Sequence, residues 1–285
     1  MNAPVSDDRV LRETRLTGAV VAPLLFVAFA VLTFWPDDTQ QLFAWTISPS
    51  MTALLLGAGY FSGAYLTARV SLARQWHHVA IAVPSLTAFV WLTALATVLH
   101  WDRFNHGHIM FVIWVVVYAV TPFAMPLLWV RNRSADPGIP DANDAVLPRA
   151  VRAVMAVAGA AELAIGVWMF VLPDSAIGLW PWNLTRLTAR VLAAWFVMPG
   201  LSALLIARDA RWSASRVLVQ GGALLAGLIL IGIVRARSDF DSANPLTYIY
   251  AALIVVTLIG FVALYAGMEA RRRRSFSLDA FMKTE

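Results

Sequence analysis

Long apolar runs alternate with short polar segments along this chain. A transmembrane helix needs about 20 residues that are mostly apolar, and eight runs come close to or reach that length. Strands of a membrane β-barrel would instead alternate polar and apolar residues over stretches of about ten residues. The pattern therefore predicts an all-α integral membrane bundle of eight transmembrane helices. These helices are predicted over residues 16–35, 50–68, 79–99, 109–130, 153–172, 187–207, 217–234 and 246–267.

Two halves of the chain resemble each other at an offset of 137 positions, with seven identities over 31 aligned residues. Pro36 and Trp45 fall on Pro173 and Trp182, and the offset slips by one residue farther on. Four helices in each half would make both halves enter the membrane in the same direction, as parallel repeats. We therefore predict two tandem four-helix repeats. The predicted units are a first repeat over residues 1–130, a cytoplasmic linker over 131–148, a second repeat over 149–270 and a basic cytoplasmic tail over 271–285.

The composition supports membrane insertion and excludes several classes of protein. Only 14% of the residues are charged and 60% are hydrophobic, whereas a soluble domain has about 25% charged residues. The net charge of +5 arises in short loops between apolar runs, so we predict contact with membrane lipids and no nucleic-acid binding. The chain has no cysteine, which excludes disulfides, thiol catalysis and cysteine-ligated metals.

The basic residues predict the orientation of the helices. Seventeen Lys and Arg residues fall on the side that holds the N-terminus, and five fall on the other side. Cytoplasmic loops carry the excess of basic residues, so both termini are predicted to be cytoplasmic. The first apolar run, of about 20 residues, is longer than the hydrophobic part of a typical signal peptide, and we interpret it as a retained helix.

The two outer loops that follow a Pro-Asp pair are unusually apolar. One contains Phe43 and Trp45, and the other contains Trp180 and Trp182. Tryptophan is enriched at the level of the lipid headgroups. We therefore expect two short amphipathic segments that lie in the outer membrane interface. The alternative is a lid over a substrate site.

Glu162 is the most informative single residue, because it lies near the middle of a predicted span. An ionisable group there costs about 2.5–3.5 kcal/mol and marks a candidate functional site. Arg190 could supply its counter-charge, and Arg186 lies one helical turn before Arg190 on the same face. Both arginines would follow a helix N-cap at Thr185, where free backbone amides can also bind an anion.

Three interpretations of this group stay open. The arginines could extend to lipid phosphates while Glu162 is neutral or hydrogen-bonded. They could line a pocket for a small anionic or amphipathic solute, with Glu162 carrying a proton. They could also form a static ion pair with Glu162. The predicted ligand-binding set is Glu162, Arg186, Arg190, Asp174 and Trp182.

A second constellation consists of His100, Asp102, His106 and His108 in one predicted outer loop. Imidazole and carboxylate groups suit Zn²⁺ or another divalent metal, although solvated histidines at the interface give the same pattern. The sequence lacks a phosphate-binding loop, a His-Glu-x-x-His motif and a Gly-x-Ser-x-Gly motif, so we predict no catalytic residue and no cofactor.

The string Trp-Pro-Trp-x-Leu-Thr-x-Leu-Thr-Ala-Arg over residues 180–190 resembles one found in uncharacterised multi-pass membrane proteins of bacteria. The resemblance covers about a fifth of the chain and implies a bacterial cytoplasmic membrane. That group has no agreed activity, so the resemblance assigns no role to any residue.

These observations favour a carrier or binder of a small anionic or amphipathic solute. One alternative is a non-catalytic membrane subunit or assembly factor, which would contact a protein partner or a second copy of the chain. The other is an intramembrane metal-dependent enzyme that uses the loop from His100 to His108.

Overall fold

The computed structural model describes residues 7–141 and 144–282. Within them the fold is all-helical, and β-pairing is limited to two isolated bridges. The long helices are α1 (Arg12–Phe34), α3 (Ser50–Leu72), α4 (Ala82–Leu99), α5 (Ile109–Asn132), α6 (Arg149–Val171), α8 (Arg186–Arg208), α9 (Trp212–Arg235) and α10 (Pro245–Met282). The short elements are α2 (Thr39–Leu42), α7 (Pro173–Ile177) and the 3₁₀ turns η1 (Trp101–Arg103), η2 (Arg133–Ala135) and η3 (Arg237–Asp239).

Seven of the long helices in the described residues are apolar enough to cross a membrane, which indicates a multi-pass membrane protein. Eight spans were predicted, and the helix outside this set is α3. Sixteen of its 23 residues are buried by neighbouring helices. A helix enclosed in this way presents little surface to lipid, so small and polar residues can replace the apolar ones.

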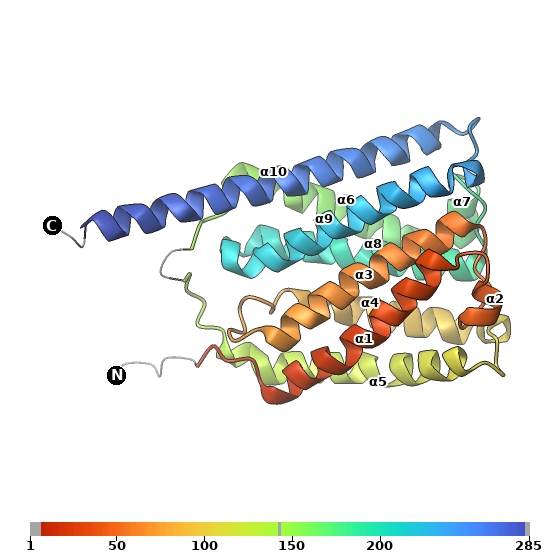
Figure 1. Cartoon of the computed structure of the whole chain (residues 1–285), viewed down its shortest axis with the longest axis horizontal. Coiled ribbons are helices and arrows are strands. Elements are labelled where there is room, and N and C mark those ends of the chain that lie inside the picture. The colour runs from red at the N-terminus through yellow and green to blue at the C-terminus, as the bar shows by residue number, and fades with distance from the viewer. Residues whose placement is uncertain (1–6, 142–143, 283–285) are drawn as a thin grey trace.

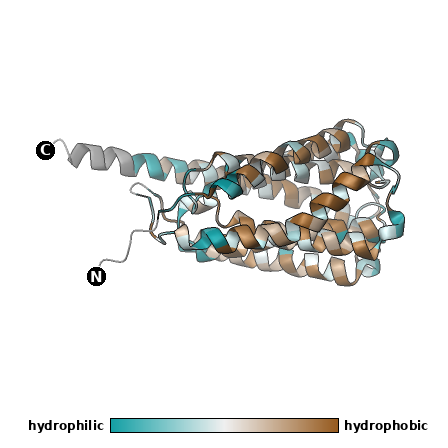
Figure 2. Ribbon diagram, turned by 90° about the horizontal axis from the view of Figure 1, so that it is seen from below, coloured by the Kyte–Doolittle hydropathy of each residue, from teal (hydrophilic) through white to brown (hydrophobic). Residues whose placement is uncertain are grey.

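The long helices run roughly side by side and form one elongated bundle (Figure 1). Helix α1 begins and α10 ends at the same end of the bundle, which we call the terminal end; α2 and α7 lie at the opposite end, which we call the far end (Figure 1). Apolar residues dominate the middle of the bundle, while polar residues gather near its ends (Figure 2). Of the predicted basic tail, Lys283 lies outside the described residues.

Helix α8 lies in the centre of the bundle and packs against α6 and α4. The contact with α6 depends on glycine, because a Cβ atom at Gly159 would lie 2.7 Å from the carbonyl oxygen of Gly200. A Cβ atom at Gly166 would lie 2.9 Å from the carbonyl oxygen of Ala193. The two backbones therefore approach closely along two turns, as small residues allow in membrane helices.

Three aromatic residues of the apolar outer loops turn into the bundle, so the expected interfacial position is wrong for Phe43, Trp45 and Trp182. Phe43, Trp45 and Trp182 are only 1–3% exposed and belong to the bundle core. The Trp45 ring stacks edge-on against Trp114 at 4.8 Å, and Trp182 Nε1 donates a hydrogen bond to Thr52 Oγ1 at 2.8 Å. Burying these large rings between helices stabilises them more than a position in the membrane interface would.

An ion network fixes the connection between α5 and α6 to the terminal end. Arg211 donates two parallel hydrogen bonds to Asp136, at 2.7 and 2.8 Å, and also pairs with Asp209 at 2.6 Å. The hydrogen bonds from Arg211 lower the pKa of Asp136, and those same contacts raise the pKa of Arg211. The network lies beside Leu147, which is 2% exposed.

Replacing Arg211 with methionine should lower the free energy of unfolding by about 1.5–3 kcal/mol, because both carboxylates lose a charged donor. The pKa of Asp136 is lowered by folding, so this contribution is present at neutral pH and is lost as the pH falls below 3.8. Denaturant titration in micelles measures the change. The control is Arg208→Met at an exposed position nearby; equal effects of both variants would contradict the prediction.

Candidate functional site

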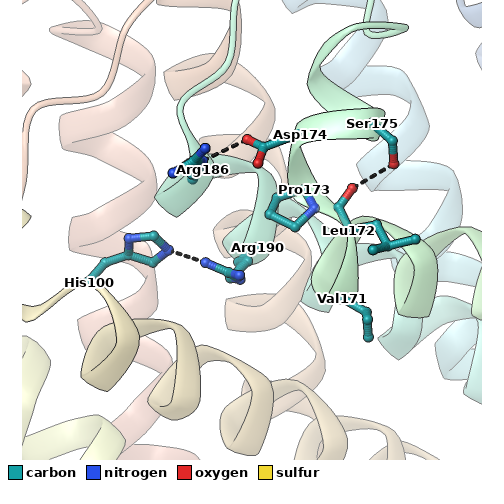
Figure 3. A pocket seen from close by; sticks show the side chains of 8 residues that line it. All are labelled: His100, Val171, Leu172, Pro173, Asp174, Ser175, Arg186 and Arg190. Carbon is teal, nitrogen blue, oxygen red and sulfur yellow. Dashed lines mark hydrogen bonds and ion pairs between the residues drawn. The ribbon is translucent and has the colours of Figure 1, made fainter.

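A pocket of about 540 Å³ opens at the far end of the bundle, where α6 ends and α8 begins. We call it the far-end pocket. It is lined by His100, Val171, Leu172, Pro173, Asp174, Ser175, Arg186 and Arg190, and Figure 3 shows how these side chains lie. The pocket thus combines three apolar residues with two arginines, one carboxylate and one histidine.

The local sequence explains why the chain turns here. Helix α6 ends at Val171, and Pro173 starts the five-residue helix α7 with a backbone that is already set for a helix. Ser175 Oγ donates to the carbonyl oxygen of Leu172 at 2.8 Å and secures the turn. The chain then returns to Thr185, whose Oγ1 accepts a hydrogen bond from the backbone amide of Thr188 at 3.2 Å and caps α8.

Arg186, the first residue of α8, forms an ion pair with Asp174. Its Nε donates to Asp174 Oδ1 at 2.6 Å, and both side chains are 66% exposed (Figure 3). A pair with this exposure contributes little to stability. Asp174 therefore neutralises Arg186 at the mouth of the pocket.

Arg190, one turn deeper, has only neutral hydrogen-bond partners. Its Nε donates to the carbonyl oxygen of Phe170 at 3.1 Å. Its Nη1 donates to His100 Nε2 at 2.7 Å (Figure 3). In the part of the chain that the structure describes, no carboxylate lies within ion-pair distance of Arg190. The pocket therefore contains a half-buried guanidinium whose charge is not compensated.

His100 can accept this hydrogen bond only as a neutral imidazole with its proton on Nδ1. Burial lowers the pKa of His100, and the nearby charge of Arg190 lowers it further; Arg103 and Arg186 act in the same direction, and Asp102 acts against them. His100 is therefore neutral at physiological pH, and it adds no positive charge to the pocket.

Glu162 and Trp182 do not line the far-end pocket. Glu162 lies nine residues before the end of α6, about 14 Å below it at the rise of an α-helix. The predicted contact between Glu162 and Arg190 is not formed, because Glu162 faces α8 at Gly200, and a Cβ atom there would lie 3.2 Å from the Glu162 Cβ. Trp182 is buried in the core instead.

The predicted outer metal ligands do not converge. His106 bonds the carbonyl oxygen of Trp101, His108 Nδ1 accepts from the backbone amide at the start of α5, and Asp102 pairs with Arg103. His100 binds Arg190 instead. The spacing of these residues along the sequence could not predict that their side chains diverge, because η1 and the start of α5 turn them in different directions.

The parts of the pocket that sequence reasoning did not assign to it are Val171, Leu172, Pro173, Ser175 and His100. A Pro-Asp pair directly after an apolar run was the available signal for the turn that forms its wall. No local signal joins His100 to Arg190, because these residues are 90 positions apart.

Lowering the pH from about 7.5 to about 5.5 should destabilise the wild-type protein relative to His100→Gln. The folded state lowers the pKa of His100 below 6.5, so the unfolded chain binds the proton more readily and protonation favours unfolding. Glutamine keeps an acceptor for Arg190 but does not titrate. Thermal unfolding across this range measures the difference, with His106→Gln as the control. A wild-type pH response in His100→Gln would contradict the prediction.

Comparisons with known proteins do not assign this chain to a family. No protein family, no curated protein and no solved structure matches it. The function is therefore inferred from the chemistry of the far-end pocket.

Proposed function

We propose that this chain is a multi-pass membrane protein that binds and carries a small anionic or amphipathic solute in the far-end pocket. The observation that carries the proposal is the uncompensated charge of Arg190. A half-buried cation with neutral partners lacks a counter-charge, and an anionic group bound in the pocket would supply it.

The walls of the pocket favour a solute with an apolar part. Val171 and Leu172 are 64% and 55% exposed, and they lie beside Pro173 and Arg190. An acyl or aryl group against these residues would be removed from water while its acidic group reached the guanidinium. The volume of about 540 Å³ is typical of pockets for small molecules.

We also propose that the protein is a tandem duplication of a four-helix unit. In support, α1, α2, α3, α4, η1 and α5 recur in the same order as α6, α7, α8, α9, η3 and α10. Related side chains make the same hydrogen bonds: Arg15 Nε donates to the carbonyl oxygen of Ser71 at 2.9 Å, and Arg152 Nε donates to that of Ala207 at 2.8 Å. The contact of α3 with α9 has its counterpart in the contact of α8 with α4.

Comparison of the two halves supports a pocket that is specific to the second one. Asp37 hydrogen-bonds Ser50, the first residue of α3, just as Asp174 bonds Arg186, the first residue of α8. The position that corresponds to Arg190 is Leu54. The second half has therefore acquired two cations on a shared scaffold, which fits a functional specialisation.

The distribution of charge supports an orientation with both termini in the cytoplasm. The five basic residues at the far end are Arg103, Arg186, Arg190, Arg235 and Arg237, and the other basic residues that the structure describes lie toward the terminal end. We propose that the far-end pocket opens to the outside of a bacterial cytoplasmic membrane. We further propose that α3 is an eighth span, since it is as long as α1 and packs beside it.

Glu162 is proposed to couple solute movement to a proton. It lies midway along α6, and no hydrogen bond or ion pair holds its carboxylate among the described residues. An acid at this depth, below a pocket for an anion, is suited to carry a proton with the solute.

Replacing Arg190 with glutamine should weaken binding of a medium-chain carboxylate by about 10- to 100-fold, because a charge-assisted contact is lost. The probe is decanoate, compared with decanol, on protein in nanodiscs of zwitterionic lipid. Arg103→Gln is the matched control, because Arg103 is 72% exposed at the same end and does not line the pocket. Equal binding of decanoate and decanol, or wild-type binding by Arg190→Gln, would exclude an anion site at Arg190.

Glu162→Gln should abolish proton-driven uptake of the bound carboxylate into proteoliposomes while its equilibrium affinity stays within about twofold of wild type. The reason is that Glu162 lies outside the pocket and glutamine cannot carry a proton. Glu13→Gln is the control, since Glu13 pairs with Arg131 at the terminal end. Uptake by Glu162→Gln at the wild-type rate would remove Glu162 from the mechanism.

A further inference from the structure

Three metal-ligating side chains meet at the terminal end of the bundle, at the opposite end from the far-end pocket. They are His77, His78 and Asp141, and one ligand atom from each lies within 4.8 Å of the others. The histidines follow α3, and Asp141 lies in the connection between α5 and α6. Segments that are more than 60 residues apart therefore supply one cluster.

The N-terminal segment holds the first histidine in place. An isolated bridge pairs Arg9 with Gln75, and the backbone amide of Trp76 donates to the carbonyl oxygen of Asp8 at 2.8 Å. Asp8 has a φ of 42°, a left-handed conformation that is uncommon for residues other than glycine. This conformation allows its carboxylate to accept from the backbone amide of His77 at 3.1 Å.

The ring of His77 is 1% exposed, and its tautomer is fixed. Its Nδ1 lies 2.6 Å from Asp8 Oδ2, which can only accept, so Nδ1 carries the proton. The other nitrogen, Nε2, faces Asp141 Oδ1 at 3.4 Å and Ser213 Oγ at 3.2 Å. In neutral His77 this nitrogen therefore presents a lone pair to two oxygen atoms.

Ser213 does not supply the missing proton. Its hydroxyl donates to Asp144 Oδ2 at 2.6 Å, and its backbone amide donates to Asp144 Oδ1 at 2.9 Å. The hydroxyl oxygen consequently faces His77 with a lone pair. This arrangement also excludes a nucleophilic serine activated by His77, because the serine proton is bound elsewhere.

The second histidine points at the same carboxylate. His78 Nε2 lies 2.9 Å from Asp141 Oδ2, and Gln75 Nε2 orients that carboxylate by donating to Oδ1 at 3.1 Å. Within the described residues, no arginine forms an ion pair with Asp8, Asp141 or Asp144. Two imidazole nitrogens and several oxygens thus converge without a positive charge between them.

We propose that His77 Nε2, His78 Nε2 and the carboxylate of Asp141 bind one divalent transition-metal ion of the Zn²⁺ type. Two imidazoles and one carboxylate are a common ligand set for zinc, and three protein ligands leave a coordination position open. The carboxylate of Asp8 on the distal nitrogen of His77 is the outer contact that orients metal-binding histidines and raises their basicity.

The surroundings leave room for the ion and a bound water. A small cavity of about 50 Å³ adjoins the cluster and is lined by His78, Asp141, Asp144 and Ser213, among others. A cavity of about 10–15 Å³ is enough to hold one water. Three arginines also border this cavity: Arg69, Arg216 and Arg272. Glu269 pairs with Arg216 at 2.9 Å and with Arg272 at 3.9 Å, and Arg69 donates hydrogen bonds to Tyr65 and Gln220.

The test is a metal titration of the purified full-length chain after removal of any polyhistidine tag and treatment with a chelator. We expect one Zn²⁺ per chain by elemental analysis, and Co²⁺ should give the visible absorption bands of a four-coordinate site. Asp8→Asn should weaken Zn²⁺ affinity by about 10- to 100-fold.

His78→Ala and Asp141→Asn should abolish stoichiometric binding, and the exposed His106→Ala is the control. His78 is only partly buried, so its replacement should leave the fold intact. The thermal unfolding of each metal-free variant shows whether that variant is folded. Zn²⁺ should raise the unfolding temperature of the wild type and leave that of His78→Ala unchanged. Absence of Zn²⁺ binding by the wild type, or wild-type affinity in His78→Ala and Asp141→Asn, would overturn the proposal. Protons shared between the imidazoles and the carboxylates would then hold the cluster together.

Discussion

The close packing of α6 against α8 is the contact on which the far end of this molecule depends. Gly159, Gly166 and Gly200 allow the two backbones to approach until a methyl group at any of them would collide with a neighbour. This approach brings the end of α6 beside the first turns of α8, so that Arg190 reaches the carbonyl oxygen of Phe170. The pocket is thus a consequence of backbone packing deep in the bundle.

The two ends of the bundle have opposite electrostatic requirements. At the far end, a guanidinium is surrounded by neutral partners and lacks an anion. At the terminal end, two imidazole nitrogens face carboxylate oxygens and lack a cation. A bundle surrounded by lipid tolerates such imbalances only near its ends, where water and solutes can reach the groups. The two proposed sites follow from these unmatched charges, and neither depends on the other.

Hydropathy predicted the helices well because lipid imposes the same length and polarity on each exposed span. The run predicted over residues 16–35 forms α1, and the one predicted over 187–207 forms α8. Hydropathy could not show that α3 would be enclosed by its neighbours. It also could not show that Trp45 and Trp182 would turn into the core, because an apolar loop can be covered by lipid or by protein.

The site residues were predicted less completely, for a related reason. Arg186, Arg190 and Asp174 were found because a helix cap and a Pro-Asp pair are local signals. The contact of His100 with Arg190, and the contacts of His77 and His78 with Asp8 and Asp141, join residues 63 to 90 positions apart. Spacing along the chain carries no information about such contacts, and the predicted metal ligands His100, His106 and His108 diverge in space although they are close in sequence.

The most direct test of the central claim is native mass spectrometry of the protein after gentle extraction from its own membrane, compared with an Arg186→Ala/Arg190→Ala double variant. If the far-end pocket holds an anionic or amphipathic solute, the wild type retains a small adduct that the double variant loses. A wild-type protein without an adduct, or the same adduct in both proteins, would contradict a solute site at these arginines.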